Sequence, residues 1–403
     1  MGDILSGGLA SIGFTWKSSP SMTELEMAMT DWLARAFGDA TLVALLSARA
    51  RAVSLAKAAE KTSTSTNWLQ SSLDKALNKI NVSKDAVQKH LKDEVTVFDN
   101  HDPSYFTKLV AYCSDQAHSS IDKGVMLAGV RMRKLKSSKD KELGNYSVEP
   151  EVLEQAIKED KAKGLTPFIM IVTVGTTNTC GVDSIKKLGG ICTREKIWLH
   201  VDAAYAGSFL LCPEFRYLAE DIHLVDSFNL NVHKAMMINF DCSPMWFKDA
   251  AEAINYFNVD PVYLKHEHQA VASDYRHLQV ALGRRFRALK IWFVLRSMGV
   301  SSIQEHLRKQ VDQAKHFARL ISQQSNFELF VPQHLGLVCF RLKGENEPNE
   351  KLNTAINDDG RIHMVPSSSH GVFFLRFAVC SQKTTLEDVE QAVEIIAEIS
   401  AKL

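Results

Sequence analysis

The sequence predicts an α/β protein with a large domain, in which helices cover both faces of a mostly parallel sheet, and a smaller C-terminal α+β domain. Strand-like and helix-like patterns alternate between about residues 109 and 247, and the strand-like runs are short and largely apolar. This combination is typical of parallel sheets that are buried on both faces. The pattern changes after a predicted helix that ends near residue 298, and 403 residues are too many for one small core.

We therefore divide the chain into an N-terminal helical segment (1–37), a large α/β domain (38–300) and a small α+β domain (301–403). Ser21-Met22-Thr23-Glu24 matches a capping box and precedes apolar residues at helical spacing. Asp39 can cap a second helix that begins near Ala40. Polar residues dominate positions 59–104, where we expect an exposed helical excursion or loop.

From residue 109 onward the predicted elements follow from apolar periodicity and from short β-branched or aromatic runs. The large domain has predicted strands at Leu109–Cys113, Val130–Leu135, Phe168–Val174, Ile197–Val201, Leu224–Phe228 and Met237–Phe247, and helices at Ser119–Ala128, Glu149–Lys163, Ile185–Glu195 and Arg284–Met298. The small domain has predicted helices at Ser302–Ser322, Glu350–Ile356 and Leu386–Leu403, and strands at Phe327–Val331, Leu337–Leu342, Ile362–Val365 and Phe373–Val379.

The composition argues against several classes of partner. Lysine plus arginine and aspartate plus glutamate both number 47, so the net charge of zero gives no pull toward nucleic acid or an anionic membrane. The seven cysteines are scattered without zinc-ligand spacing, so we expect no metal site. No apolar run approaches the ~20 residues that span a bilayer. With no secretory signal in view, we expect reduced thiols and a cytoplasmic location.

Polar side chains gather just after four predicted strands, where ligands bind in open α/β sheets. They are Asp115, His118, Thr176, Thr177, Asp202, Asn231, His233 and Lys234. No glycine-rich dinucleotide motif and no nucleoside-triphosphate loop is present, which disfavours those two ligand classes.

Lys234 lies between two apolar runs in DSFNLNVHKAMMINF, an unusual place for a strongly hydrated cation. A lysine stem that packs on the core while its ammonium reaches water would explain it. A second interpretation adds the strand-end carboxylate Asp202 and the flat imidazole of His118. Together these suit pyridoxal 5′-phosphate: the amine captures the aldehyde, the carboxylate keeps the ring nitrogen protonated and the imidazole stacks on the ring. Taken singly, Asp202 also fits a helix cap and His118 an ordinary surface or core histidine.

Five segments, in order along the chain, resemble the group II pyridoxal-phosphate-dependent decarboxylases. They are YCSDQAHSS (112–120), VGTTNTCGVDS (174–184), WLHVDAAYAGS (198–208), DSFNLNVHK (226–234) and LGRRFRALKIWFV (282–294). The aromatic-L-amino-acid (DOPA) decarboxylases are the most similar branch and the histidine decarboxylases the next. The resemblance implies the aspartate-aminotransferase-like type I fold with a sheet of the seven-stranded type. It also implies a homodimer that converts DOPA or 5-hydroxytryptophan to its amine, the step that leads to dopamine and serotonin.

The resemblance also implies roles for individual residues. Lys234 resembles the Schiff-base lysine, Asp202 the partner of the pyridinium nitrogen and His118 the stacking imidazole; Thr177 and Ala204 resemble ring contacts, and Asn231 and His233 neighbours of the phosphate. Tyr263 resembles the loop tyrosine that protonates the substrate α-carbon. Ile12 and Phe14 resemble residues that one subunit lends to its partner's substrate pocket, and Gly283 matches DOPA-type enzymes where histidine-selective relatives carry serine.

Two departures from the family pattern leave alternatives open. A family segment ahead of Met1 is absent, and Phe37-Gly38-Asp39-Ala40-Thr41 keeps little of the glycine-rich loop that binds the cofactor phosphate. Two lost hydrogen bonds to a charged group, at ~1.5–3 kcal/mol each, would weaken binding a hundredfold or more. The alternatives are an impaired paralogue or isoform that forms a heterodimer with a full-length subunit, a histidine decarboxylase and an aldehyde synthase. Aldehyde-forming relatives tend to replace the residues at His118 or Tyr263, and this chain keeps both.

Overall fold

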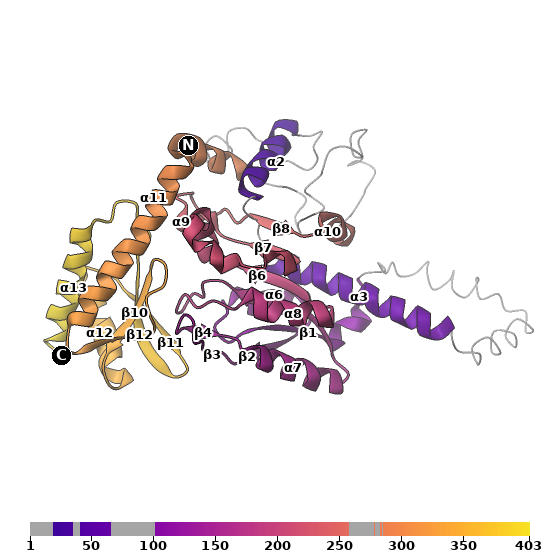
Figure 1. The fold of residues 1–403 in the computed structure, drawn as a ribbon, viewed down its shortest axis with the longest axis horizontal. Helices are drawn as coiled ribbons and strands as arrows, with labels where there is room; N and C mark the ends of the chain where they lie inside the picture. Colours follow the sequence, from indigo (N-terminus) through magenta and orange to yellow (C-terminus); the bar gives the residue numbers. More distant parts are fainter. Residues whose placement is uncertain (1–18, 35–40, 66–100, 258–277, 279–282, 284) are drawn as a thin grey trace, which may run out of the picture.

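The computed structural model describes residues 19–34, 41–65, 101–257, 278, 283 and 285–403 (Figure 1). Its central feature is a six-stranded sheet with the strand order β2-β1-β5-β6-β7-β8. The strands are β1 (Leu109–Ser114), β2 (Arg131–Leu135), β5 (Thr166–Thr173), β6 (Trp198–Asp202), β7 (Ser227–Asn229) and β8 (Met245–Phe247). All neighbouring pairs are parallel except β7 with β8, so the predicted mostly parallel sheet is confirmed.

The strand order reverses its direction of growth between β1 and β5. The chain passes from β1 to β2 on one side and then crosses to β5, β6 and β7 on the other. Such a switch point leaves a crevice beyond the carboxyl ends of the two central strands, where open α/β sheets bind ligands. The loops that follow β1 and β5 carry His118 and Thr177.

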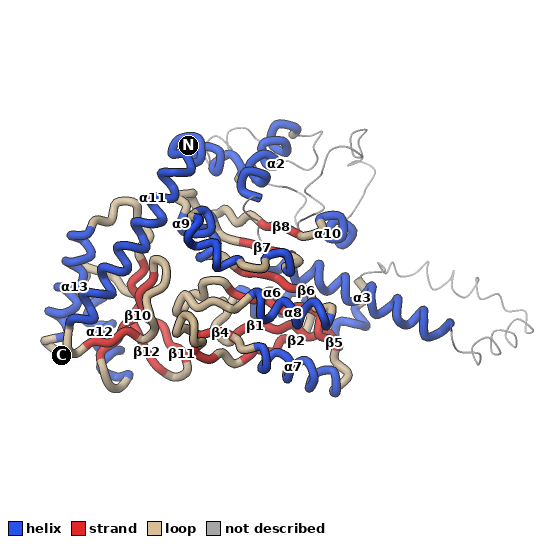
Figure 2. The backbone as a smooth tube through the Cα atoms, viewed as in Figure 1, coloured by secondary structure: helices blue, strands red, loops and turns tan. Residues whose placement is uncertain are grey.

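Helices cover both faces of this sheet (Figures 1 and 2). The helices α3 (Thr41–Ser65) and α6 (Ser120–Ala128) pack on one face, and α7 (Pro150–Ala162) and α8 (Ile185–Glu195) pack on the other. Alternate strand residues serve the two apolar cores: Ala111, Ile169, Ile171 and Trp198 lie in the first, and Val110, Met170, Val172 and Leu199 in the second. Both faces are buried, which explains why these strands are continuous apolar runs in the sequence.

The small domain is an antiparallel sheet with helices on one side. Its strand order is β11-β12-β10-β9, with β9 (Phe327–Leu329), β10 (Leu337–Leu342), β11 (Val365–Ser369) and β12 (Val372–Ala378). The helices α12 (Asn346–Asp359) and α13 (Leu386–Ser400) share an apolar core with these strands and with the C-terminal half of α11 (Ala288–Gln323). The remaining elements are α2 (Pro20–Ala34), the short hairpin of β3 (Ser138–Lys139) and β4 (Tyr146–Ser147), α9 (Val232–Ala235), α10 (Ala250–Phe257) and four 3₁₀ turns.

The helix α11 joins the two domains, as Figure 1 shows. It replaces the two helices predicted at 284–298 and 302–322, and at Gly299 its backbone leaves helical geometry with φ 73° and ψ 164°. Glycine tolerates this left-handed region, so the chain kinks there and the helix resumes. The predicted boundary at 300/301 falls next to this kink and stays a prediction.

Three local predictions are wrong. The helix α2 begins at Pro20, and Ser19 accepts from the Thr23 amide at 3.2 Å, so Ser21 lies inside the helix and caps nothing; proline favours a first helical turn because it has no amide to satisfy. The strand predicted at Met237–Phe247 keeps only Met245–Phe247, and Met237 itself has a left-handed φ of 58°.

The third error concerns the edge of the small sheet. The strand predicted at Ile362–Val365 forms instead at Val365–Ser369, where it pairs with β12. Its serines face the large domain and form hydrogen bonds there, so the segment is polar and carries no apolar strand signal. Among the helices that the structure describes, none is long and apolar enough to cross a membrane.

Candidate active site

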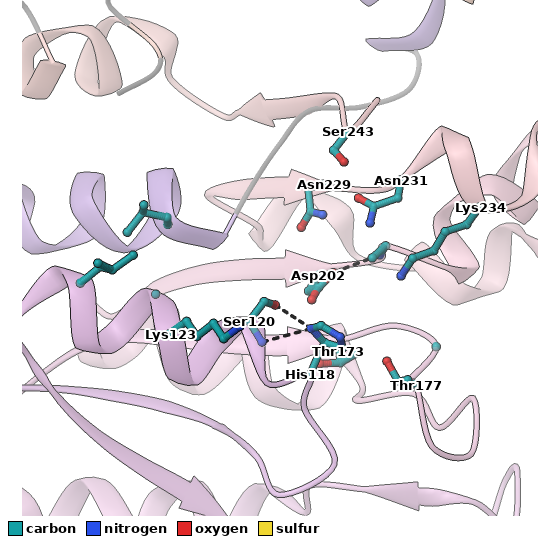
Figure 3. A pocket seen from close by; sticks show the side chains of 15 residues that line it. His118, Ser120, Lys123, Thr173, Thr177, Asp202, Asn229, Asn231, Lys234 and Ser243 are labelled. Carbon is teal, nitrogen blue, oxygen red and sulfur yellow. Dashed lines mark hydrogen bonds between the residues drawn. The ribbon is translucent and has the colours of Figure 1, made fainter. Parts of the chain in front are cut away.

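A cavity of about 360 Å³ opens at the carboxyl ends of the central strands (Figure 3). Six of the predicted site residues line it: His118, Thr177, Asp202, Ala204, Asn231 and Lys234. They come from four different strand ends, so only the fold brings them together. The volume lies within the range that small-molecule sites occupy.

Lys234 enters the cavity from α9, the short helix that follows β7. Its amide donates to Asn231 O at 3.0 Å, and its neighbours Ala235 and Met236 are buried. The side chain extends toward Asp202 (Figure 3). Lys234 is exposed in the open cavity, so the expectation that its ammonium lies in an apolar neighbourhood is wrong, although the residues that follow it are buried. Burial nevertheless lowers the pKa of the ammonium, and the Asp202 carboxylate partly opposes that effect.

Asp202 ends β6 and is only 5 % exposed. Its Oδ1 accepts a hydrogen bond from the Ala204 amide at 3.0 Å, while Ala204 O accepts from the Asn231 amide at 3.0 Å. No described residue donates to Asp202 Oδ2. A buried carboxylate with one unsatisfied oxygen is suited to an N–H or cationic partner in the cavity.

His118 lies on the opposite wall, in the loop after β1. Its Nδ1 accepts from the Ser120 amide at 3.1 Å and lies 2.9 Å from Ser120 Oγ. Because Nδ1 accepts, a neutral His118 carries its proton on Nε2. Nε2 has no partner among the residues that the structure describes. The imidazole therefore offers one N–H at the cavity wall.

The small domain holds the loops that carry His118 and Thr177, and Gln116 is the centre of that contact. Gln116 Oε1 accepts from Ser369 Oγ at 3.1 Å and from Asn178 Nδ2 at 3.4 Å. Its Nε2 donates to Asp115 Oδ1 at 3.1 Å. Gln116 is buried, so it connects both loops to β11 through bonds that water does not replace.

Two further side chains from the small domain reach the same loops. Arg376 Nη1 donates to Thr177 O at 2.6 Å. His370 stacks on Tyr146 with ring centroids 4.7 Å apart and an interplanar angle of 9°, and its Nε2 lies 3.2 Å from Ser137 Oγ. Both domains therefore shape the cavity wall, which no single stretch of sequence reveals.

Sequence reasoning missed several residues that line the cavity. Thr173, Asp202 and Asn229 are register partners on β5, β6 and β7 and form a polar row across the sheet. Thr173 Oγ1 and Asn229 Oδ1 are buried without a hydrogen-bond partner in the described structure. A polar residue that closes a buried apolar strand is a usable signal, and both residues carry it. Ser120, Lys123 and Ser243 also line the cavity.

The other predicted site residues do not line this cavity. His233 Nδ1 lies 2.8 Å from Cys242 O and 3.0 Å from Cys242 N, so its ring contacts that backbone. Gly283 is exposed and is not part of the cavity wall. Ile12, Phe14 and Tyr263 lie outside the described residues, as does the Phe37–Ala40 segment. Their roles stay predictions.

The geometry combines three chemical capabilities in one cavity: an amine with a lowered pKa, a buried carboxylate with a free oxygen and an imidazole N–H. The amine can attack a carbonyl, and the carboxylate can hold a protonated ring nitrogen. Within the described part of the chain, no group of three histidine, cysteine, aspartate or glutamate residues is placed to hold a metal ion.

Comparison with protein families gives one match over most of the chain. Residues 1–343 match the family model described as the pyridoxal-dependent decarboxylase conserved domain. The aromatic-L-amino-acid decarboxylase of Drosophila melanogaster is 46% identical over 389 residues, which cover 96% of this chain and 72% of that protein.

Solved structures agree with the sequence comparison. The Oryza sativa TDC bound to PLP and tryptamine superimposes with a TM-score of 0.82 at 30% identity and covers 100% of this chain and 80% of its own. The Rhodiola rosea 4-hydroxyphenylacetaldehyde synthase has a TM-score of 0.80 at 30% identity with the same coverage. The two differ in the product that their names imply, so the fold alone does not select the reaction.

Proposed function

Because the chain belongs to the pyridoxal-dependent decarboxylase family, we propose that it removes the carboxylate of aromatic L-amino acids and releases aromatic amines. Its cofactor is pyridoxal 5′-phosphate. The observation that carries the proposal is Lys234 and Asp202 facing one cavity, the amine with a lowered pKa and the carboxylate with a free oxygen.

The residues present fit that cofactor. Asp202 Oδ2 is an acceptor without a donor, which the N–H of a protonated pyridine supplies. Lys234 is the amine for the aldehyde, and no described carboxylate forms an ion pair with it. Asn231 and Ser243 add polar groups for the phosphate at the cavity wall. When bound, the cofactor supplies an aldehyde for the amine and a ring that accepts the electron pair left by departing carbon dioxide.

The residues of this protein then have separate roles in the reaction. Asp202 holds the proton at the ring nitrogen, which keeps the ring able to accept electrons. Burial lowers the pKa of Lys234, so a larger fraction is the neutral amine that attacks a carbonyl and takes up or gives a proton. His118, with its proton held on Nε2 by the bond from Ser120, would supply the imidazole face for the ring and an N–H toward the substrate carboxylate. Tyr263 provides the proton for the substrate α-carbon.

The substrate class rests on the relatives and on two residues. The Drosophila relative is named for aromatic L-amino acids, and this chain keeps His118 and Tyr263 together. Gly283 favours a bulkier ring than imidazole, so DOPA and 5-hydroxytryptophan are the expected substrates. We propose for Ile12 and Phe14 the role that the family resemblance implies, a contribution from one subunit to the substrate pocket of the other.

A homodimer would complete the site. Met126 is 78% exposed and Leu127 is 73% exposed, and Leu127 also lines the cavity. Large apolar side chains at a cavity rim are typical of surfaces that a partner covers. Analytical ultracentrifugation of the full chain would give twice the monomer mass. The seven free cysteines support a reducing, cytoplasmic location, which cell fractionation would test.

The decisive experiment titrates the purified chain with pyridoxal 5′-phosphate, reduces it with borohydride and locates the modified lysine by mass spectrometry. The adduct is expected at Lys234, and Lys234→Ala should abolish it. Lys123→Ala is the matched control, since Lys123 is the other lysine on the cavity wall. An adduct at Lys123 in the unmodified chain would refute the assignment.

Activity assays then separate the remaining alternatives. Carbon dioxide and amine from L-DOPA or 5-hydroxytryptophan support decarboxylation, whereas carbon dioxide from L-histidine alone would indicate a histidine decarboxylase. Aldehyde with hydrogen peroxide would indicate oxidation, as the name of the Rhodiola relative suggests. Cofactor capture without turnover would favour the non-catalytic subunit, and inserting a glycine-rich loop between Phe37 and Ala40 should then raise cofactor affinity.

A further inference from the structure

A network of buried polar side chains lies along one face of β6 and β7, the strands that carry Asp202 and its register partner Asn229. Trp198 Nε1 donates to Ser227 Oγ at 2.8 Å, and Ser227 Oγ lies 2.8 Å from His200 Nδ1. All three residues are at most 1% exposed. Polar groups this deep in an apolar core cost free energy unless their hydrogen bonds serve the fold or a site.

The hydrogen bonds of this network assign the tautomer of His200. The indole N–H of Trp198 can only donate, so Ser227 Oγ accepts from it and has one hydrogen left to give. Ser227 Oγ could also accept from an Nδ1–H, so the assignment of this hydrogen to His200 Nδ1 rests on Asn229 Oδ1, a buried acceptor without a donor that an Nε2–H would supply. Burial lowers the pKa of His200 to about 4, so the ring is neutral near pH 7 and carries its proton on Nε2.

The next step leads to Asn229. His200 Nε2 and Asn229 Oδ1 are both buried and both lack a hydrogen-bond partner in the described structure. One is a donor and the other an acceptor, and the Asn229 side chain is among the groups that act on the His200 ring. His200 pairs in register with Ser227, and Asp202 pairs with Asn229 two residues further on the same face. An N–H at His200 Nε2 can therefore satisfy the acceptor Asn229 Oδ1.

Asn229 lies between this hydrogen-bond network and the cavity. It is 3% exposed, lines the cavity wall and is the register partner of Asp202 (Figure 3). If Oδ1 faces His200, the amide N–H₂ faces the cavity side, beside the Asp202 carboxylate. A donor there favours the ionised, correctly turned carboxylate, and outer partners of this kind are worth tenfold or more in ligand affinity.

We infer that His200 is a positioning residue that, through Asn229, orients the Asp202 carboxylate for the ring nitrogen of the cofactor. The inference rests on the proposed function for the identity of the ligand. It assigns a role to a buried histidine that touches neither cofactor nor substrate.

The test compares three variants of the full chain. His200→Phe keeps a planar ring but removes the donor, while His200→Gln places an amide N–H₂ where Nε2 stood. Ser227→Ala leaves His200 in place and releases its tautomer. We expect about tenfold weaker binding of pyridoxal 5′-phosphate for the Phe variant. The pKa of the bound cofactor's ring nitrogen, followed by absorbance, should fall by about one unit. A tenfold loss of affinity for the protonated ring corresponds to one pKa unit.

His200→Gln should restore most of the cofactor affinity and most of the titration shift. Ser227→Ala should show a smaller loss of affinity and a smaller shift than His200→Phe. A merely structural role predicts instead that Gln fails as Phe does, or that all three variants bind and titrate like the parent; either result overturns the inference. Should the Phe variant not fold, unchanged binding and titration in Ser227→Ala overturns it equally.

A readout without cofactor separates this inference from the proposed function. Imidazole nitrogen NMR of the cofactor-free chain, with the His200 signals identified by their absence in His200→Gln, reports the tautomer directly. We expect the proton on Nε2, and a proton on Nδ1 overturns the inference. If the unmodified protein does not bind pyridoxal 5′-phosphate, that result contradicts the proposed function. The inference about His200 is then decided by the tautomer measurement.

Discussion

His200 makes the acid stability of this protein predictable. It is fully buried between the sheet and the helices that cover it, and burial lowers its pKa from the ordinary 6.5 to about 4. The unfolded chain therefore takes up a proton at this residue as the pH falls below 6.5, and the folded chain does not until about pH 4. Stability that is present above pH 6.5 is lost across this window.

The size of the loss follows from the two pKa values. They differ by 6.5 minus about 4, and each pH unit corresponds to about 1.4 kcal/mol, so the full effect is about 3 kcal/mol. Most of this falls between pH 7.5 and pH 4.5. For a protein whose total stability is on the order of 10 kcal/mol, this is a large and measurable fraction.

His200→Gln removes the titration while it keeps a polar side chain of similar reach. Urea unfolding of both proteins, freed of cofactor and followed by tryptophan fluorescence, gives the free energy of unfolding at several pH values. The variant is expected to be the less stable at pH 7.5 and to regain most of this difference of about 3 kcal/mol on its parent by pH 4.5. Parallel pH profiles would show that His200 is not held neutral, and the account of its burial would be wrong.

Three other perturbations test separate parts of the structure. Burial raises the pKa of Asp183 to about 6 from the usual 3.8, so the parent loses stability as the pH rises through that range. Asp183→Asn should gain on the parent by about 2 kcal/mol between pH 4 and 7 in the same unfolding assay, opposite in direction to His200→Gln. Gln116→Ala removes three side-chain hydrogen bonds, of which the bond to Ser369 crosses between the domains. At about 1 kcal/mol each, their loss should lower the unfolding free energy by about 3 kcal/mol and weaken cofactor binding; full cofactor affinity would contradict a positioning role. His370→Phe keeps the stacking on Tyr146 and loses the bond to Ser137, so a loss near 1 kcal/mol is expected, and a loss as large as that of His370→Ala would mean that the stacking contributes nothing.

The sequence predicted the central sheet well because its signals are local. β1, β5 and β6 are apolar runs of the length of a strand, and both of their faces are buried, so periodicity and composition reveal them. The helix α8 begins and ends at the predicted residues, Ile185 and Glu195, since Ser184 caps it by accepting from the Lys187 amide. Where local signals conflict with packing, the prediction failed, as at β11, whose serines form bonds across the domain contact.

For the site, strand-end position and residue type identified Lys234, Asp202 and His118 without any structure. Which neighbours complete the cavity depends on register between strands that lie far apart in the sequence, and register follows from the packing of both sheet faces. That is why the row of Thr173, Asp202 and Asn229 emerged only from the folded chain. A linear sequence carries the chemical type of each side chain and its local periodicity. The free oxygen of Asp202, the neutral state of His200 and the contacts of Gln116 depend on burial and on partners that only the packed chain supplies.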